Sequence, residues 1–398
     1  MRWHSFFSPF NVSSAMSLAM IASLSVPSVA LSATAKPQQA REQTIGRLET
    51  VATFYDAMPT GVTVTASGRI FINYPRWGDN VPFTVAELRN GKAVPYPDAT
   101  VNRETGGDAA GHFISVQSVV ADSQDRLWVL DTAAPGFAPP LAGGAKLVAI
   151  DLKTNKIVRT IVFPANVMQP RTYVNDVRFD FRVGRAGVAY VTDSSLSGIG
   201  GIIIVDLDTG TAIRRLTGDP STSADPSFEP VVEGKTLMGR NADGTTSAFT
   251  VASDGIALSP DGKTLYFCPL SSRHLYSVPT ATLLDPALSD HNVASSVKDL
   301  GEKGASDGLE ADADGAVYAG DYERDSIRKL VPGGQWRTIA HDPRILWPDT
   351  MSIGPDGYLY FTANQLHRQA GFHGGKDMRK KPYALFRLRI DASPAPTR

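Results

Sequence analysis

The sequence predicts an all-β fold, a six-bladed β-propeller, and two observations lead to it. A unit of strand, tight polar turn and return strand recurs along the chain, and each end carries one further strand without a neighbour. In the clearest unit, residues 305–330, Asp312–Gly315 is a turn, Val317–Gly320 a return strand, and a third strand begins near Ile327. Aspartate and glycine tolerate the positive φ of tight hairpins, and the residues lack helical periodicity.

Similar units occupy the rest of the chain. Residues 252–278 carry a Ser-Pro-Asp-Gly turn and residues 347–365 a Gly-Pro-Asp-Gly turn, and weaker copies cover 62–74, 116–131 and 173–193. A unit that cannot cover its own apolar face must stack on its neighbours, and the spacing of the units suits four-stranded blades with variable loops. The second strand of each unit contains one aromatic residue of the series Phe71, Trp128, Tyr190, Tyr266, Tyr318 and Tyr360.

The two strands without neighbours lie at Leu48–Phe54 and Ala384–Ile390. An unpaired edge would let a ring of sheets open. We therefore expect these strands to pair and to close the propeller, which makes residues 47–398 a single domain.

The first 33 residues differ from the rest. Arg2 precedes a short apolar stretch, and small residues offer cleavage after Ala30 or Ala33, as in a secretory signal peptide. Residues 34–46 are polar and predict a linker. No later apolar run approaches the ~18 residues of a membrane span. We therefore expect a secreted or periplasmic monomer, with no membrane contact after cleavage.

Charge and cysteine content exclude other classes. The net charge of −1 gives no reason to expect a nucleic acid or an anionic membrane as partner. The single cysteine, Cys268, excludes a disulfide within the chain. It lies in a predicted strand, so we expect a buried free thiol. Protease, hydrolase and nucleotide-binding motifs are missing from the sequence.

Polar residues recur where the innermost strand of a unit begins. These candidate site residues are Asn175, Asp176, Asp254, Asp307 and Asp349. Innermost strands line the channel of a propeller, so their starts converge on one opening. Converging carboxylate and amide oxygens suit a hard cation, or an amine or polyol. Mutual repulsion also raises carboxyl pKa values, so one group can stay protonated. The alternative is that they cap turns without any ligand.

Other aspartates have structural interpretations. Asp261 and Asp356 belong to Pro-Asp-Gly turns. Asp131, Asp193 and Asp321 end second strands, where we expect them to cap loops. Two long loops, 218–250 and 368–382, either cover a site or have no visible role.

The order of several short motifs resembles the yellow / major royal jelly protein family, in its bacterial branch. They are DRLWVLDT at 125–132, YVTDSS at 190–195, GIALSPDG at 255–262, SDGL at 306–309 and LWPDT at 346–350. The resemblance implies a secreted six-bladed propeller. Family members include a pigment-pathway protein associated with dopachrome conversion, amine-binding salivary proteins and nutritive proteins, so the family does not define one reaction.

A second, fainter resemblance is to the gluconolactonase / senescence marker protein family of calcium-dependent lactone hydrolases. It rests on Asn175-Asp176 and on residues 255–262, and it implies a divalent cation such as calcium, held by Asn175 and Asp254. The family's first-blade glutamate has no counterpart near residues 59–61, and its aspartate after the Leu-Tyr strand falls on Pro269.

Three functional hypotheses follow. The first is a binding protein for an amine or small ring compound, with tautomerase-like isomerase activity, in which Asp254 and Asp307 act as acid and base and Asn175 orients the ligand. The second is a metal-dependent lactonase. The third is a non-catalytic scaffold.

Overall fold

Alternating strand patterns and polar turns produce an almost entirely β structure in the computed structural model, which describes residues 43–103 and 108–396. The predicted signal peptide and residues 34–42 of the predicted linker lie outside the described residues, so cleavage and export stay predictions. In the described end of that linker, Ile45 forms an antiparallel bridge with His341. No helix in the described ranges has the length and apolar character needed to cross a membrane.

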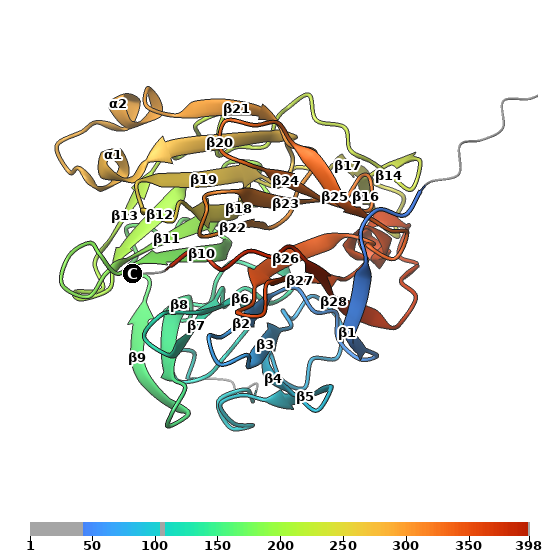
Figure 1. The fold of residues 1–398 in the computed structure, drawn as a ribbon, viewed down its shortest axis with the longest axis horizontal. Coiled ribbons are helices and arrows are strands. Elements are labelled where there is room, and N and C mark those ends of the chain that lie inside the picture. Colours follow the sequence, from blue (N-terminus) through green and yellow to red (C-terminus); the bar gives the residue numbers. More distant parts are fainter. Residues whose placement is uncertain (1–42, 104–107, 397–398) are drawn as a thin grey trace, which may run out of the picture. The chain divides into compact units, whose positions relative to one another are not determined.

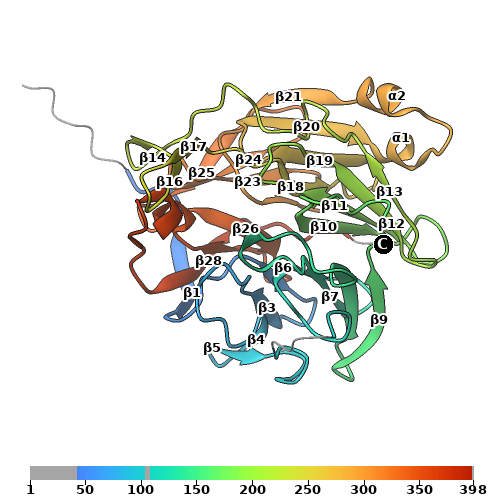
Figure 2. The ribbon, with the colours of Figure 1, turned by 180° about the vertical axis from the view of Figure 1, so that it is seen from behind.

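Six four-stranded antiparallel sheets, called blades 1 to 6 in chain order, confirm the predicted fold class. Figure 1 shows them around a common centre, and Figure 2 shows the same ring from behind. Blades 1 to 3 contain β2 (Val62–Val64), β3 (Ile70–Asn73), β4 (Val85–Arg89), β5 (Lys92–Pro95); β6 (Val116–Ala121), β7 (Arg126–Asp131), β8 (Lys146–Asp151), β9 (Lys156–Val162); and β10 (Val174–Asp180), β11 (Val188–Asp193), β12 (Ile202–Asp206), β13 (Ala212–Arg215).

The second half of the ring repeats this order from the innermost to the outermost strand. Blades 4 to 6 contain β18 (Ser253–Leu258), β19 (Thr264–Pro269), β20 (His274–Pro279), β21 (Lys298–Glu302); β22 (Leu309–Ala311), β23 (Val317–Asp321), β24 (Ser326–Leu330), β25 (Arg337–His341); and β26 (Pro348–Ile353), β27 (Tyr358–Ala363), β28 (Tyr383–Arg389), β1 (Leu48–Phe54).

Blade 6 is completed by the first strand of the chain. Strand β1 pairs antiparallel with β28, and Leu48 lies opposite Leu388 while Phe54 lies opposite Tyr383. This confirms the predicted closure between the chain ends, with the last strand starting one residue earlier than expected. The innermost strands β2, β6, β10, β18, β22 and β26 each contact the next, and β26 contacts β2, so the ring is closed.

The core is divided among the interfaces between blades. Trp128 of blade 2 and Phe179 of blade 3 stack with ring centroids 4.8 Å apart in one such cluster. Cys268 is fully buried between blades 4 and 5, where it packs near Leu309. Burial raises the pKa of this thiol, as expected for a structural cysteine.

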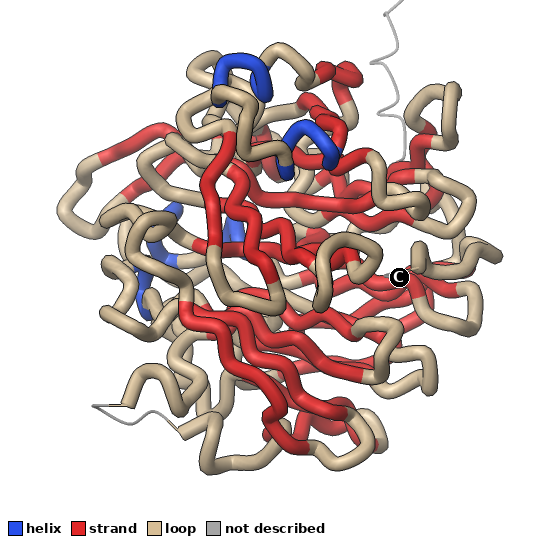
Figure 3. Tube along the Cα trace, turned by 90° about the vertical axis from the view of Figure 1, so that its left-hand side faces the viewer, coloured by secondary structure: helices blue, strands red, loops and turns tan. Residues whose placement is uncertain are grey.

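Some short elements were not predicted. Figure 3 shows how little of the chain is helical. The two α-helices, α1 (Thr280–Leu284) and α2 (Asp290–Ala294), are single turns too short to produce a helical apolar period. Elsewhere in the chain there are three 3-10 turns, η1 (Pro135–Phe137), η2 (Leu366–Arg368) and η3 (Ala370–Phe372). The 218–250 segment contains two hairpins, from β14 (Val231–Val232) with β15 (Lys235–Thr236) and β16 (Met238–Arg240) with β17 (Thr246–Ala248).

Candidate functional site

The starts of the innermost strands gather polar side chains at one mouth of the channel. They line a cavity of about 330 Å³, and the innermost segments of blades 2 to 6 supply one polar residue each: Gln117, Asn175, Asp254, Asp307 and Asp349. All five are between 3% and 7% exposed. Four of the five predicted residues are therefore brought together around one space.

A break in strand pairing positions most of these residues. The register of β6 with β7 shifts around Gln117, and that of β10 with β11 shifts around Asn175. The same shift brackets Asp254 in β18 and Asp349 in β26. A β-bulge re-aims the side chain it carries and is frequent beside functional sites. The repeated bulge explains why residues in equivalent positions of different blades all face the channel.

Two glycines set the spacing between neighbouring carboxylates. A Cβ atom at Gly255 would lie 2.3 Å from the carbonyl oxygen of Asp307, and one at Gly308 would lie 2.4 Å from that of Asp349. The Asp-Gly pairs are therefore not turns. Glycine lets the next innermost strand approach closely, so Asp254, Asp307 and Asp349 become neighbours across three blades.

Hydrogen bonds from the residues that directly follow two of the second strands hold the polar ring. The Ser194 hydroxyl lies 2.9 Å from both the Asn175 amide nitrogen, which donates to it, and Asp254 Oδ2. In blade 6, the amide nitrogen of Asn364 donates to Asp349 Oδ2 at 2.6 Å. The orientation of the ring residues is thus determined before any ligand is present.

A tryptophan with an uncommon backbone conformation, Trp347, holds Asp307. Trp347 Nε1 donates to Asp307 Oδ2 at 2.8 Å, and the Trp347 ring stacks on Tyr322 with centroids 4.0 Å apart. Trp347 has a left-handed backbone, with φ of 61°, which is rare for a bulky residue. The stacking and the hydrogen bond keep it there.

The three carboxyl groups have raised pKa values, and burial is the largest cause for each. Burial raises the pKa of Asp307 to about 6. Burial and then the charge of Asp307 raise the pKa values of Asp254 and Asp349 well above the usual range. Asp254 shares a hydrogen bond with Asp307. Asp254 and Asp307 therefore titrate as a coupled pair, in which the charge of Asp307 favours the protonated form of Asp254.

Aromatic rings form one wall of the cavity. The rings of Trp77 and Phe137 stack at 4.8 Å, and Phe137 lies 5.1 Å from Tyr173. Trp77 Nε1 donates to the Tyr173 hydroxyl at 2.9 Å, and that hydroxyl donates to Gln117 at 3.0 Å. The wall is therefore connected to the polar ring by hydrogen bonds.

The long 218–250 segment covers the opposite side. Phe249 lies edge-on to Trp347 and to Phe372, at 6.1 and 5.9 Å between centroids. The β14–β15 turn is joined to the rim by Glu233, whose carboxylate lies 3.1 Å from His367 Nε2 and also pairs with Arg368. Both predicted long loops thus contribute to the cavity, which favours the covering role over no role.

Asp176, the fifth predicted residue, does not line the cavity. Its carboxylate accepts from the Ser118 hydroxyl at 2.7 Å and from Arg178 at 3.0 Å. It neighbours Asn175 in the same bulge, so the two side chains point in different directions. Which of these two adjacent residues faces the cavity is decided by the tertiary structure and not by the sequence pattern.

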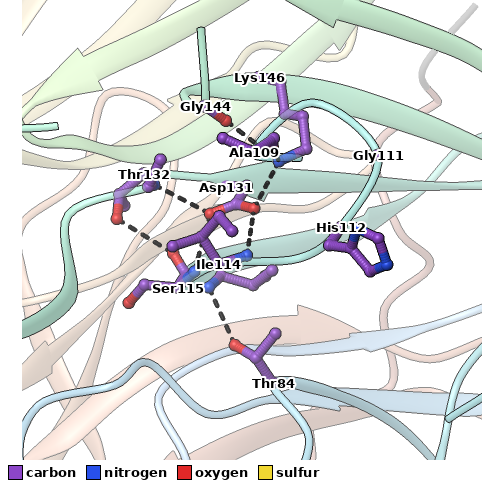
Figure 4. A network of polar contacts seen from close by, with 12 residues as sticks. Thr84, Ala109, Gly111, His112, Ile114, Ser115, Asp131, Thr132, Gly144 and Lys146 are labelled. Carbon is purple, nitrogen blue, oxygen red and sulfur yellow. Dashed lines mark hydrogen bonds and ion pairs between the residues drawn. The ribbon is translucent and has the colours of Figure 1, made fainter. Parts of the chain in front are cut away.

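Asp131 caps a loop, as predicted for it, and Figure 4 shows the network around it. Its carboxylate accepts from the backbone amides of Ile114 and Ser115 at 2.7 and 2.9 Å. It also pairs at 2.8 Å with Lys146, which is 1% exposed and donates to two carbonyl oxygens as well. Asp193 likewise accepts from the Tyr173 amide, and Asp321 pairs with Arg324.

Gln117 and the aromatic wall were missed by sequence reasoning. A signal for Gln117 existed, because Val116-Gln117 occupies the same place in its unit as Val174-Asn175. The wall residues Trp77 and Phe137 lie in loops between blade strands and outside any repeat, so no pattern indicated them.

The residues at this site do not fit a calcium ion. Among the described residues, no group of three or more histidine, cysteine, aspartate or glutamate side chains is arranged to hold a metal. Calcium needs six to eight oxygen ligands, whereas the carboxylate oxygens Asp254 Oδ2, Asp307 Oδ2 and Asp349 Oδ2 already accept hydrogen bonds from Ser194, Trp347 and Asn364.

Comparisons with known proteins agree with the fold. A family model described as major royal jelly protein matches residues 114–393. Protein yellow of Drosophila erecta is 29% identical over 251 residues, which cover 58% of this chain and 42% of that protein. Protein yellow of Drosophila melanogaster is 28% identical over 250 residues, with the same coverage. The matched region thus spans less than half the length of these relatives.

Solved structures share the fold at low sequence identity. A luciferin-regenerating enzyme has a TM-score of 0.53 at 10% identity and covers 88% of this chain and 99% of its own. A gluconolactonase from Xanthomonas campestris has a TM-score of 0.51 at 14% identity, over 87% of this chain and 90% of its own. Regucalcin from Agrobacterium tumefaciens, a calcium-binding protein, has a TM-score of 0.50 at 15% identity, over 88% of this chain and 98% of its own.

Proposed function

The chain belongs to the major royal jelly protein family, and we propose that it binds a small organic amine with a planar ring at the channel mouth. The observation that carries this proposal is the set of three buried carboxyl groups, Asp254, Asp307 and Asp349, in a cavity that no lysine or arginine of the described residues lines.

Electrostatics support a cationic ligand. A buried carboxylate without a cation is costly, and its pKa rises until it takes up a proton. An ammonium group removes that cost by supplying the missing charge and up to three donors. Asn175 directs its amide nitrogen to Ser194, so its carbonyl oxygen is available as a further acceptor beside Asp254.

The aromatic walls support a planar ring attached to that ammonium. Trp77, Phe137 and Phe249 line the cavity together with Leu270. Aromatic faces attract both cations and other rings, and small-molecule sites are mostly apolar with a few polar groups that fix orientation. A compound with an ammonium at one end and a ring at the other matches both halves of the cavity.

The test is the pH dependence of amine binding. The affinity for phenethylamine should fall about tenfold from about pH 7 to about pH 5, because Asp307, with a pKa raised to about 6, takes up a proton as the pH falls. The amine stays charged in this pH range, so the change in affinity comes from titration of the protein and not of the ligand. Isothermal titration calorimetry at both pH values measures it.

Phenethyl alcohol, which has the same ring without the charge, is the matched control ligand. Its affinity should be weaker and nearly independent of pH. Equal affinity for the amine at the two pH values would contradict a role of the carboxyl groups in ligand recognition.

A second proposal, tautomerisation of a bound ring compound, is favoured by the direct interaction of the Asp254 and Asp307 carboxyl groups, which raises the pKa of Asp254. The Asp307 carboxylate takes a proton from a ring carbon, and the Asp254 carboxyl returns one to a ring oxygen. Transfer across their hydrogen bond then restores both groups, so no net proton is consumed.

Dopachrome, the ring compound suggested by the family resemblance, is the probe for this proposal. Its visible absorbance should decay faster with the protein, and Asp307→Asn should reduce that acceleration about 100-fold. Asp261→Asn, in a turn on a solvent-exposed loop, is the control and should retain it. Equal decay with and without the wild-type protein would leave binding as the function.

A further inference from the structure

A second cavity adjoins the first on the same end of the propeller. It has a volume of about 390 Å³ and lies between the loops that follow β7, β9 and β11. Phe137, Tyr173 and Leu196 line both spaces. We call this second space the outer groove. Its remaining walls are formed by the 138–140 segment, by 170–172 and by Ser197.

The boundary between the two spaces consists partly of exposed side chains. Phe137 is 38% exposed and Leu196 is 45% exposed, so neither is held by close packing on all sides. A change of rotamer at either residue requires no movement of the core. Tyr173, in contrast, is buried and hydrogen-bonded to Trp77, so it forms the fixed side of the boundary.

The chemistry of the outer groove differs from that of the inner cavity. Pro139, Pro140 and Pro170 give it rigid apolar walls, whereas no carboxyl group of the described residues lines it. Arg171 lines it and is exposed, and no hydrogen bond or ion pair with the described residues engages its guanidinium. The two spaces together thus offer buried carboxyl groups, aromatic rings, apolar walls and a cation.

We propose that the outer groove is the outer half of a single elongated binding site. It takes the apolar tail of an amine whose ammonium lies at Asp307, and it favours a tail that ends in an anionic group beside Arg171. The inner end of this ligand rests on the proposed function. The proposal rests on the pair of cavities that share Phe137, Tyr173 and Leu196, one of them lined by carboxyl groups and the other by Arg171.

Three probes test it by calorimetry: phenethylamine, phenethylamine with a para-hexyl chain, and the same chain ending in a carboxylate. Because buried methylene groups favour binding, the hexyl amine should bind the wild-type protein about tenfold more tightly than phenethylamine. The carboxylate should add about a further fivefold through the Arg171 guanidinium.

Variants confined to the outer groove identify where the tail lies. Ala138 is exposed and has an extended backbone, so Ala138→Trp fills the groove without burying a new side chain in the core. This variant should lose the gain in affinity from the hexyl chain and keep the wild-type affinity for phenethylamine. Arg171→Ala should remove only the gain from the carboxylate. Lys156→Ala, an exposed cation on the outermost strand β9, should change none of the three affinities.

The outcomes separate this proposal from the one on which it rests. No binding of phenethylamine to the wild-type protein contradicts the proposed function. Binding of phenethylamine without any gain from the hexyl chain, or a gain that survives in Ala138→Trp, contradicts the outer groove alone.

Discussion

Replacing Asp307 by asparagine is expected to weaken phenethylamine binding about 100-fold, the range found when one partner of a buried charge pair is removed. Asp307 carries charge near neutral pH, because its pKa is raised only to about 6. Asparagine keeps an oxygen for the hydrogen bond from Trp347 Nε1. The loss of affinity is therefore caused by removal of the negative charge and not by a collapse of the site.

Calorimetry at neutral pH measures this effect, and thermal unfolding checks the fold. The variant should unfold at a temperature no lower than the wild type, since a buried carboxylate without a cation is itself costly. Asp261→Asn is the control, because this side chain is 58% exposed in a Pro-Asp-Gly turn. Unchanged affinity in Asp307→Asn would contradict recognition of the amine by this ring.

Replacing Asp131 by alanine should lower the free energy of unfolding by about 3–5 kcal/mol, since breaking a buried ion pair from one side leaves the other charge uncompensated. The stranded charge is Lys146, which is 1% exposed. The Ile114 and Ser115 amides also lose their acceptor. Urea denaturation followed by circular dichroism gives the change directly.

An exposed ion pair provides the matched control for Asp131. The Arg185 and Asp208 side chains are 83% and 25% exposed and lie 2.6 Å apart. Asp208→Ala should cost under about 1 kcal/mol. A double variant, Asp131→Ala with Lys146→Met, should recover part of the loss because the buried charge is gone. A loss below about 1 kcal/mol in Asp131→Ala would contradict the structural role of this pair.

The fold was largely predictable because its signals are local. The Asp314-Gly315 turn and the two Pro-Asp-Gly turns lie between apolar strands and mark hairpins, and the strands at Leu48–Phe54 and Ala384–Ile390 had no other partner. The elements that were missed, such as α1 and the β14–β15 hairpin, are short. Their few residues show no apolar period, because contacts with the rest of the ring decide their conformation.

The sequence by itself determined which residues begin the innermost strands, and therefore that Asn175, Asp254, Asp307 and Asp349 surround one opening. Only the tertiary structure decided that Asp176 turns away to Arg178 and that Phe249 and Trp77 enclose the opening. The physical reason is the range of the interactions. Strand and turn signals act over a few neighbours, whereas bulge direction, close approach at glycine and loop packing depend on blades that meet only after the ring has closed.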